Sequence, residues 1–411
     1  MKLNKKKEQE LKATITSETS DALGYQNGKL VQERSLALDY YNSEKMGNEV
    51  EGRSQVISSD VLEAVESVLP SLLRIFTAGD DIVKFEPVGE EDEKASQQAT
   101  EYINHIIFKD NDGWRIFYTW FKDALIQKNG FIKHYYKYED EFLKESYKDL
   151  TEIEYQALLV DDAVEVLNVE EKASETMVQT EQGEMPDVQT TFNVDIKRKS
   201  SSGKICIENI PPEEMLLSKR AKTIQDAPFV AHRIKKTISD LIAEGYDRKK
   251  IEDLPSYETT NNNQEDISRN IFNDSGINEN ADPSMREVLV QECYIRSDVD
   301  NDGVAELIKV ICVGDSNEIL DVEEIDYIPF STITPIINPH RLFGMSVADL
   351  VMDIQQIKSV LLRQLCDNAF LMNNSRVLAV ENQVNLDDLL SSRAGNIVRV
   401  KNPNAVVPMQ A

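Results

Sequence analysis

The sequence is short of basic charge. Among its 411 residues, 45 are Lys or Arg and 73 are Asp or Glu, so the formal net charge at pH 7 is −28. Proteins that hold nucleic acids tightly neutralise the phosphates with Lys and Arg, and proteins that lie on anionic membranes use the same side chains. The shortage therefore excludes a typical basic nucleic-acid binder and a basic membrane-surface protein.

Cysteines and long apolar runs are scarce as well. The four cysteines are widely separated and form no CxxC pair: Cys206, Cys293, Cys312 and Cys366. This excludes a disulfide-rich secreted scaffold and predicts reduced thiols in a cytosolic compartment. No run approaches the roughly 18 apolar residues of a membrane-spanning helix, and no apolar segment of a signal peptide follows the N-terminal lysines. We therefore expect a soluble intracellular protein.

The short motifs of common enzymes are missing too. The sequence contains no GxxxxGK[ST] loop, no GxSxG elbow and no GxGxxG fingerprint. The four histidines are too scattered for an HExxH metal motif: His105, His134, His232 and His340. An unrecognised metal-dependent hydrolase built from clustered carboxylates stays an alternative, because catalytic residues often meet only in the fold. No pattern favours an enzyme, so we expect no catalytic site and no cofactor.

The chain is nevertheless apolar enough to build cores. It is 41% hydrophobic, which argues against wholesale disorder, and at about 100–200 residues per domain its length predicts two to four domains or subdomains. Apolar periodicity predicts an α+β fold. The expected helices are 59–77, 91–128, 237–246 and 346–373, and the expected strands are 82–87, 131–138, 188–198, 204–209, 229–234, 288–297 and 304–313.

Two of the helices have clear boundaries. In the first, Ser59 is a candidate N-cap, and Pro70 is expected to kink the helix because proline lacks the backbone donor. In the last, Ser346 and Asp349 form an acidic version of the capping box. That helix is expected to span about 27 residues and about 40 Å, which is longer than an ordinary globular helix.

Three segments read as connections or solvated surface. The Ser-Ser-Ser-Gly run at 200–203 predicts the turn of a β-hairpin. Residues 139–186 contain fifteen acidic and three basic side chains, which predicts a solvated face or loop. The Asn-rich residues 256–285 predict a flexible loop or linker.

Four carboxylates follow the expected strand 288–297 at short intervals: Asp298, Asp300, Asp302 and Glu306. With Gly303 they resemble the start of a calcium loop, in which oxygen ligands surround a hard cation. However, Lys309 stands where an EF-hand needs its bidentate Glu, and the flanks read as strands. The alternative is that Asn301, Asp302 and Gly303 form a tight hairpin turn. A calcium-dependent binding module and a simple turn both stay open here.

Several longer stretches resemble the portal proteins of tailed bacteriophages, in particular the large portal subunits of short-tailed phages. The strongest is Pro339-His-Arg-Leu-Phe-Gly-Met-Ser-Val-Ala-Asp-Leu-Val-Met-Asp-Ile-Gln-Gln-Ile-Lys358. The other matching stretches are 52–76, 123–133, 212–216, 227–233, 298–306 and 363–368. The resemblance thus extends over most of the chain, from about residue 50 to about residue 370.

The resemblance implies a structural protein of the virion, assembled in the host cytoplasm, and not an enzyme. Such subunits form a homo-oligomeric ring, usually a dodecamer, at one capsid vertex. The ring there is the head–tail connector. Double-stranded DNA passes through the channel during DNA packaging and DNA ejection without sequence-specific binding. The implied partners are the terminase large subunit, a head–tail adaptor, and capsid or scaffolding proteins. An acidic lumen suits this task, because it repels phosphates and lets the polyanion slide.

The resemblance also assigns regions by their order along the chain. They are an N-terminal polar arm (1–50), a wing that is helical and then β-rich (51–235), a first stem helix region (236–258), a flexible loop with the clip β-hairpins (259–338), a long stem helix (339–374) and a β-containing C-terminal segment (375–411). Because relatives with this signature are generally longer, we expect the C-terminal segment to be incomplete. The candidate channel or subunit-interface residues are Asp349, Asp353, Lys358 and Arg363.

Overall fold

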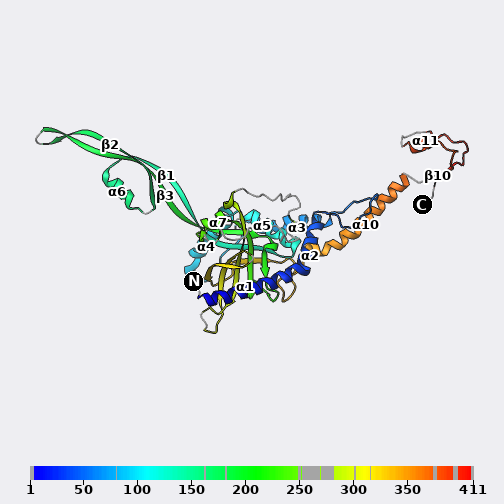
Figure 1. Cartoon of the computed structure of the whole chain (residues 1–411), viewed down its shortest axis with the longest axis horizontal. Helices are drawn as coiled ribbons and strands as arrows, with labels where there is room; N and C mark the ends of the chain where they lie inside the picture. The colour runs from blue at the N-terminus through cyan, green and yellow to red at the C-terminus, as the bar shows by residue number, and fades with distance from the viewer. Residues whose placement is uncertain are drawn as a thin grey trace. The chain divides into compact units, whose positions relative to one another are not determined.

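A computed structural model describes residues 4–411, apart from 80, 162, 181–182, 249–250, 252–268, 270–281, 300–301, 315, 374–376, 392–396 and 409–411. Most of the expected loop 256–285, and Asp300 of the acidic run, lie outside the described residues. The fold is α+β, as predicted (Figure 1). It divides into two compact units, one of residues 1–78, 117–132 and 209–411 and the other of residues 79–116 and 133–208.

The first unit contains a five-stranded antiparallel sheet in the order β4-β5-β6-β7-β8. The strands are β4 (Met215–Leu217), β5 (Phe229–Thr237), β6 (Glu287–Ser297), β7 (Glu306–Val313) and β8 (Glu318–Glu324). The predicted strands 229–234, 288–297 and 304–313 are thereby confirmed. The first four residues of β5 are all buried, because both faces of this sheet are covered.

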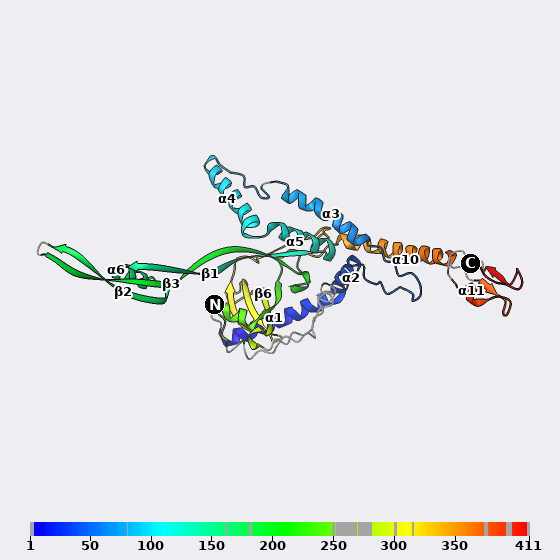
Figure 2. The same cartoon turned by 90° about the horizontal axis from the view of Figure 1, so that it is seen from above.

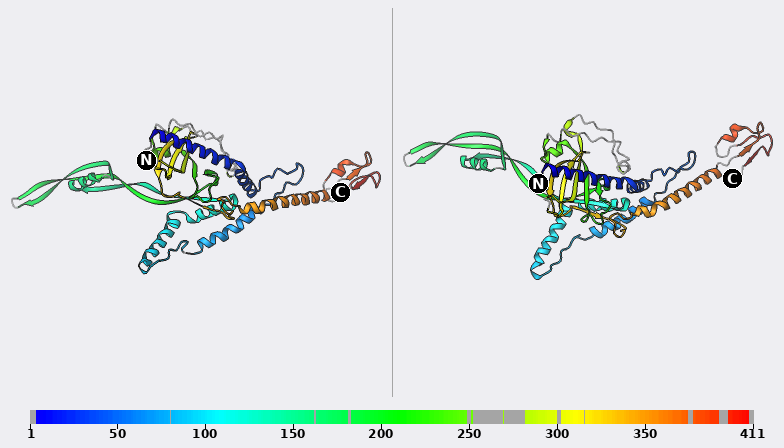
Figure 3. Two further views of the ribbon diagram at one scale, coloured as in Figure 1. Left: turned by 90° about the horizontal axis from the view of Figure 1, so that it is seen from below. Right: turned by 60° about the horizontal axis from the view of Figure 1, so that its bottom comes forward.

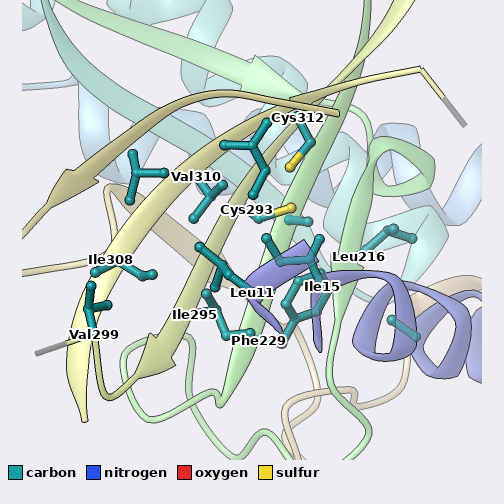
Figure 4. Packing of buried hydrophobic residues seen from close by; sticks show 14 residues of the cluster. Leu11, Ile15, Leu216, Phe229, Cys293, Ile295, Val299, Ile308, Val310 and Cys312 are labelled. Atoms are coloured by element: carbon teal, nitrogen blue, oxygen red, sulfur yellow. The ribbon is translucent and has the colours of Figure 1, made fainter. Parts of the chain in front are cut away.

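One face of the sheet is covered by α1 (Lys5–Tyr25). Leu11 and Ile15 of this helix pack against Phe229 and Cys293 of the sheet (Figure 4). The first helix of the region expected to be a polar arm (1–50) thus completes a core. The sequence hides this role because the buried side of α1 is a single narrow row of four residues, of which the third, Thr19, is polar.

The opposite face carries a second core cluster. Met215, Leu217 and Tyr294 of the sheet pack there with Phe330 of β9 (Phe330–Ile333). The rings of Tyr294 and Phe330 meet edge to face, with centroids 5.3 Å apart, which is a favoured aromatic geometry. The sheet thus holds two apolar layers.

The helices of the first unit form a third cluster. They are α2 (Val31–Tyr41), α3 (Asp60–Thr77), α5 (Gly113–Gln127) and α10 (Val347–Asn373). Val61, Val65, Leu69 and Leu73 of α3 are buried at four-residue steps. The predictions for α3 and α10 are confirmed, and Pro70 lies inside α3 without ending it. Figure 2 shows α10 beginning beside α2 and α3 and then extending beyond them.

Shorter elements complete this unit. They are α7 (Ile238–Ala243), β10 (Val377–Ala379), α11 (Leu386–Leu390) and β11 (Val406–Pro408). Thr237 caps α7 as predicted, because its hydroxyl accepts from the Asp240 amide at 3.1 Å. The helix ends earlier than the predicted residue 246.

The second unit contains α4 (Glu93–His105), α6 (Glu152–Val160) and the long strands β1 (Gly130–Leu150), β2 (Val164–Thr180) and β3 (Gly183–Ile210). The strand order is β2-β3-β1-β9, in which the first residues of β1 belong to the first unit. Figure 3 shows α6 beside the three long strands. The acidic stretch 139–186 is therefore mostly strand and helix and not a loop, but its described side chains are largely exposed, as the predicted solvated face requires.

The predicted hairpin turn at 200–203 is also wrong, because β3 continues through it. Gly203 is needed there for close packing: a Cβ at this position would overlap the hydroxyl of Tyr136 on β1. The Ser-Ser-Ser-Gly run has the composition of a turn, but its glycine lets two strands approach closely.

Two further predictions fail in the second unit. The expected strand 82–87 is irregular, because side chains take its backbone donors: Ile82 donates to Asn104 Oδ1 at 2.9 Å and Phe85 to Thr100 Oγ1 at 3.0 Å. The expected helix 91–128 breaks at Asn111, whose backbone is extended. The Asn111 side chain bonds the backbone of β3 at Ile205 and Ile207.

Candidate assembly surface on the last long helix

The N-terminus of α10 is fixed by the capping box that the sequence predicts. The Ser346 amide donates to Asp349 Oδ2 at 2.8 Å, and the Asp349 amide donates to Ser346 Oγ at 3.0 Å. Asp349 also forms an ion pair with Lys128 at 3.0 Å, and Lys128 pairs with Glu33 of α2 at 2.8 Å. The start of the helix is therefore tied to two other parts of its own subunit.

In its first turns α10 packs apolar side chains such as Ala348 and Val351 into the helical core, but from Gln355 onward the side that faces the protein is polar. Gln355, Ser359 and Arg363 recur at four-residue steps and are buried. Gln355 accepts from the Val61 amide at 2.8 Å and Ser359 from the Ser58 amide at 3.0 Å. Each polar side chain thus satisfies a backbone group of the segment that leads into α3, as buried polar groups require.

Arg363 is the most heavily bonded of these side chains. Its guanidinium donates to the Val56 carbonyl at 2.9 Å and to Asn48, and it pairs with Glu49 at 2.6 Å. Burial acts to raise the pKa of Glu49. The amides of Met46 and Gly47 and the charge of Arg363 outweigh burial, so the pKa lies below its usual value.

The opposite side of α10 is apolar and exposed. Five large side chains at three- and four-residue steps are each between 54% and 67% exposed: Leu350, Ile354, Ile357, Leu361 and Leu365. We call these five residues the α10 stripe. Amphipathic helices normally bury the apolar side and expose the polar one. From Gln355 onward the arrangement in α10 is reversed, so the subunit leaves an apolar surface in water.

The four candidate channel or subunit-interface residues of this helix divide into two pairs. Asp353 and Lys358 are exposed beside the stripe, and Lys358 pairs with Asp60 at 2.5 Å. Asp349 and Arg363 instead bond within their own subunit, and their side chains are only 11% and 8% exposed. Their partners are far away in the sequence, so helical periodicity could not reveal them.

The acidic run after β6 was the other candidate. Single carboxylate oxygens of Asp298, Asp302 and Glu306 lie within 4.8 Å of one another. Each carboxylate accepts a backbone amide of the same loop: Glu306 from Val299 at 2.9 Å, Asp298 from Gly303 at 3.1 Å and Asp302 from Val304 at 2.7 Å. These bonds account for the carboxylates as parts of a turn.

Two further observations describe this loop. Gly303 has a φ of +91°, which favours glycine, although the connection from 298 to 305 is longer than the predicted tight turn. Lys7 of α1 donates to the carbonyls of Asp298 and Val299 and so brings a positive charge to the loop. Apart from the proximity of the three carboxylates, no feature of the described residues points to a bound cation.

The family of the chain follows from comparison with known proteins. The family model described as "Phage SU10 portal protein" matches residues 11–411, and no curated protein matches the chain. Across the described segments, no helix combines the length and the apolar character that crossing a membrane requires. The resemblance to the portals of short-tailed phages is thus confirmed over nearly the whole sequence: the chain belongs to the phage SU10 portal protein family.

Proposed function

We propose that this chain is the structural subunit of a portal ring, a dodecamer at one capsid vertex, through which DNA is packaged and ejected. Membership of the family makes it a phage portal protein and a component of the virion. The proposal adds the channel, the docking of the terminase large subunit and a head–tail adaptor, contacts with capsid or scaffolding proteins, and assembly in the host cytoplasm. Catalysis of DNA translocation would then belong to the terminase.

The α10 stripe is the observation that carries this proposal. Five large apolar side chains on one helix face are a bigger exposed surface than single subunits usually tolerate. Neighbouring subunits in a ring would cover such a surface. In this arrangement α10 is the long stem helix of the resemblance, running along the channel, and the exposed Asp353 is the candidate that contributes negative charge near the DNA.

Symmetry then suggests the second surface. A closed ring of more than two subunits uses two different surfaces on each subunit. The inner side of α10 is occupied by the segment 48–61 of its own chain, so we place the second surface on the far side of that segment. Val50 and Val56 are 53% and 45% exposed there, and they supply apolar area for the neighbouring stripe.

The same geometry predicts one specific contact between neighbouring subunits. Rotation about an axis parallel to α10 moves a residue around the ring without changing its level along the helix. Arg363 Nε lies 2.9 Å from the Val56 carbonyl, so Val56 is level with this part of α10. Leu361, half a turn of helix earlier, would then meet Val56 of the partner subunit.

Disulfide cross-linking tests both the ring and the contact. In a Cys366→Ser background, the double variant Leu361→Cys with Val56→Cys should form covalent ladders of subunits on oxidation, and neither single variant should. Rings seen by negative-stain microscopy without cross-links would refute this contact but keep the portal. A wild-type chain that stays monomeric at every concentration would refute the proposed ring itself.

A further inference from the structure

The helix α6 exposes an apolar surface that is separate from the contact proposed for the α10 stripe. A capping box fixes its start, because the Thr151 amide donates to Glu154 Oε2 at 2.9 Å. Tyr155 faces the sheet and stacks on Phe192 of β3, with centroids 4.8 Å apart. The helix is therefore anchored on one side.

The other side of α6 is apolar and points to water. Ile153 and Val160 are each 81% exposed, and Leu159 is 53% exposed. Ile153, Ala157 and Val160 are spaced by four and then three residues, so they lie on one helix face. None of the nine residues of α6 is buried, although the helix contains Ile153, Leu158, Leu159 and Val160, and helices normally bury such large apolar side chains.

Acidic side chains lie on α6 and on β2, the strand that contacts it. Glu152 and Glu154 lie on α6 itself, and on β2 Glu165, Glu170 and Glu171 are exposed. The basic residues of β3 nearest in register are already paired: Lys197 with Glu165 at 3.7 Å, and Arg198 with Asp161 at 3.1 Å. The fifteen acidic and three basic residues of 139–186 leave a strong net negative field.

We propose that α6 is a docking site for a basic amphipathic helix of another protein. The apolar row of the partner would pack on Ile153, Ala157 and Val160, and its flanking Lys or Arg side chains would face the carboxylates of α6 and β2. Complementary charge of this kind selects partners and accelerates their encounter. The same field repels DNA and anionic lipid. It also repels the identical acidic surface of α6 and β2 in a second copy of the chain.

The contact goes beyond the proposed ring and does not depend on it. A helix laid on an apolar face with charged flanks is a recurring mode of peptide recognition. Since the surface belongs to α6 and β2, binding there leaves the α10 stripe untouched. A partner could therefore be held on the subunit before or after assembly.

Peptide binding tests the proposal on the full chain. The probe is a synthetic helical peptide made only of Leu and Lys, with the leucines on one face. We expect the double variant Ile153→Gln with Val160→Gln to lose at least about tenfold in affinity, since glutamine removes the apolar contact while keeping helix propensity. The matched control is Val304→Gln, at a site that is 64% exposed in the other unit, and it should bind like the wild type.

Two further measurements separate the possible outcomes. Binding should weaken as salt is added, and hydrogen exchange should slow at residues 152–160 on adding the peptide. Equal binding of the double variant, equal binding of a peptide with Glu in place of Lys, or no protection at α6 would each overturn the proposal. A change in oligomeric mass caused by the double variant would also overturn it, because the occupant would then be a second copy.

Discussion

The five-stranded sheet and the helix α10 treat their apolar side chains in opposite ways. In the sheet, Phe229, Ala231 and Cys293 are fully buried beneath α1. In α10, Leu361 and its four companions are exposed, and Gln355 and Ser359 take the inner side. The sheet therefore stabilises the single subunit, whereas the apolar surface of α10 is available to a neighbour in the proposed ring. Hydropathy alone does not distinguish these two uses.

The largest effect is expected in the sheet. Phe229 is 0% exposed, so Phe229→Ala should lower the free energy of unfolding by about 3–5 kcal/mol, through lost burial and a cavity. Denaturant unfolding followed by circular dichroism measures the change. The exposed control Val304→Ala should stay within about 0.5 kcal/mol of the wild type. A loss below about 1 kcal/mol in Phe229→Ala would mean that this layer is not the core.

A slightly smaller effect is expected on the polar side of α10. Arg363→Ala leaves the buried carboxylate of Glu49 without its cation, which should cost about 3 kcal/mol of unfolding free energy. The neighbouring Gln356 is exposed, so Gln356→Ala serves as the control and should be nearly neutral. If both variants unfolded alike, the inner side of α10 would not hold the helix in place.

Acid should weaken the same contact. The pKa of Glu49 lies below its usual value in the fold, so its contribution is complete above the unfolded pKa of about 4.3 and is lost as pH falls through the lower folded pKa. The stability advantage of the wild type over Glu49→Gln should therefore shrink from about pH 6 to about pH 3.5. A constant difference over that range would contradict the assigned role of the carboxylate.

The smallest effect on the subunit is expected in the α10 stripe. Leu361→Ser changes a side chain that is 59% exposed, so the unfolding free energy should move by no more than about 0.5 kcal/mol. Mass photometry should nevertheless show fewer oligomers than for the wild type. A large loss of stability without any change in assembly would remove the contrast between the sheet and α10.

Local patterns made part of this fold predictable. The helices α3 and α10 and the strands β6 and β7 follow from apolar spacing, and the capping box of Ser346 and Asp349 follows from two residues three apart. The apolar spacing of the α10 stripe can be read from the sequence, but this spacing does not tell which side of the helix faces the protein. That side is set by Val56, Ser58 and Val61, whose backbone groups bond the polar side.

The wrong predictions share a physical cause. At Asn111, a side-chain bond to β3 ends the helix that the apolar spacing predicts. At Gly203, close packing against Tyr136 of β1 explains the glycine, which the sequence presents as part of a turn. At α1, the buried row is too narrow to stand out from the charged residues around it. In each case the missing information lies in a segment far away in the sequence.

The position of α1 has a consequence for the making of the protein. Leu11 and Ile15 are synthesised long before their packing partners on β7 and β8, which end near residue 324. At about 5–20 residues per second, the helix waits on the order of 15–60 seconds for its binding face. During that time its apolar row is available to chaperones, and the core of the sheet closes only after β8 has been synthesised.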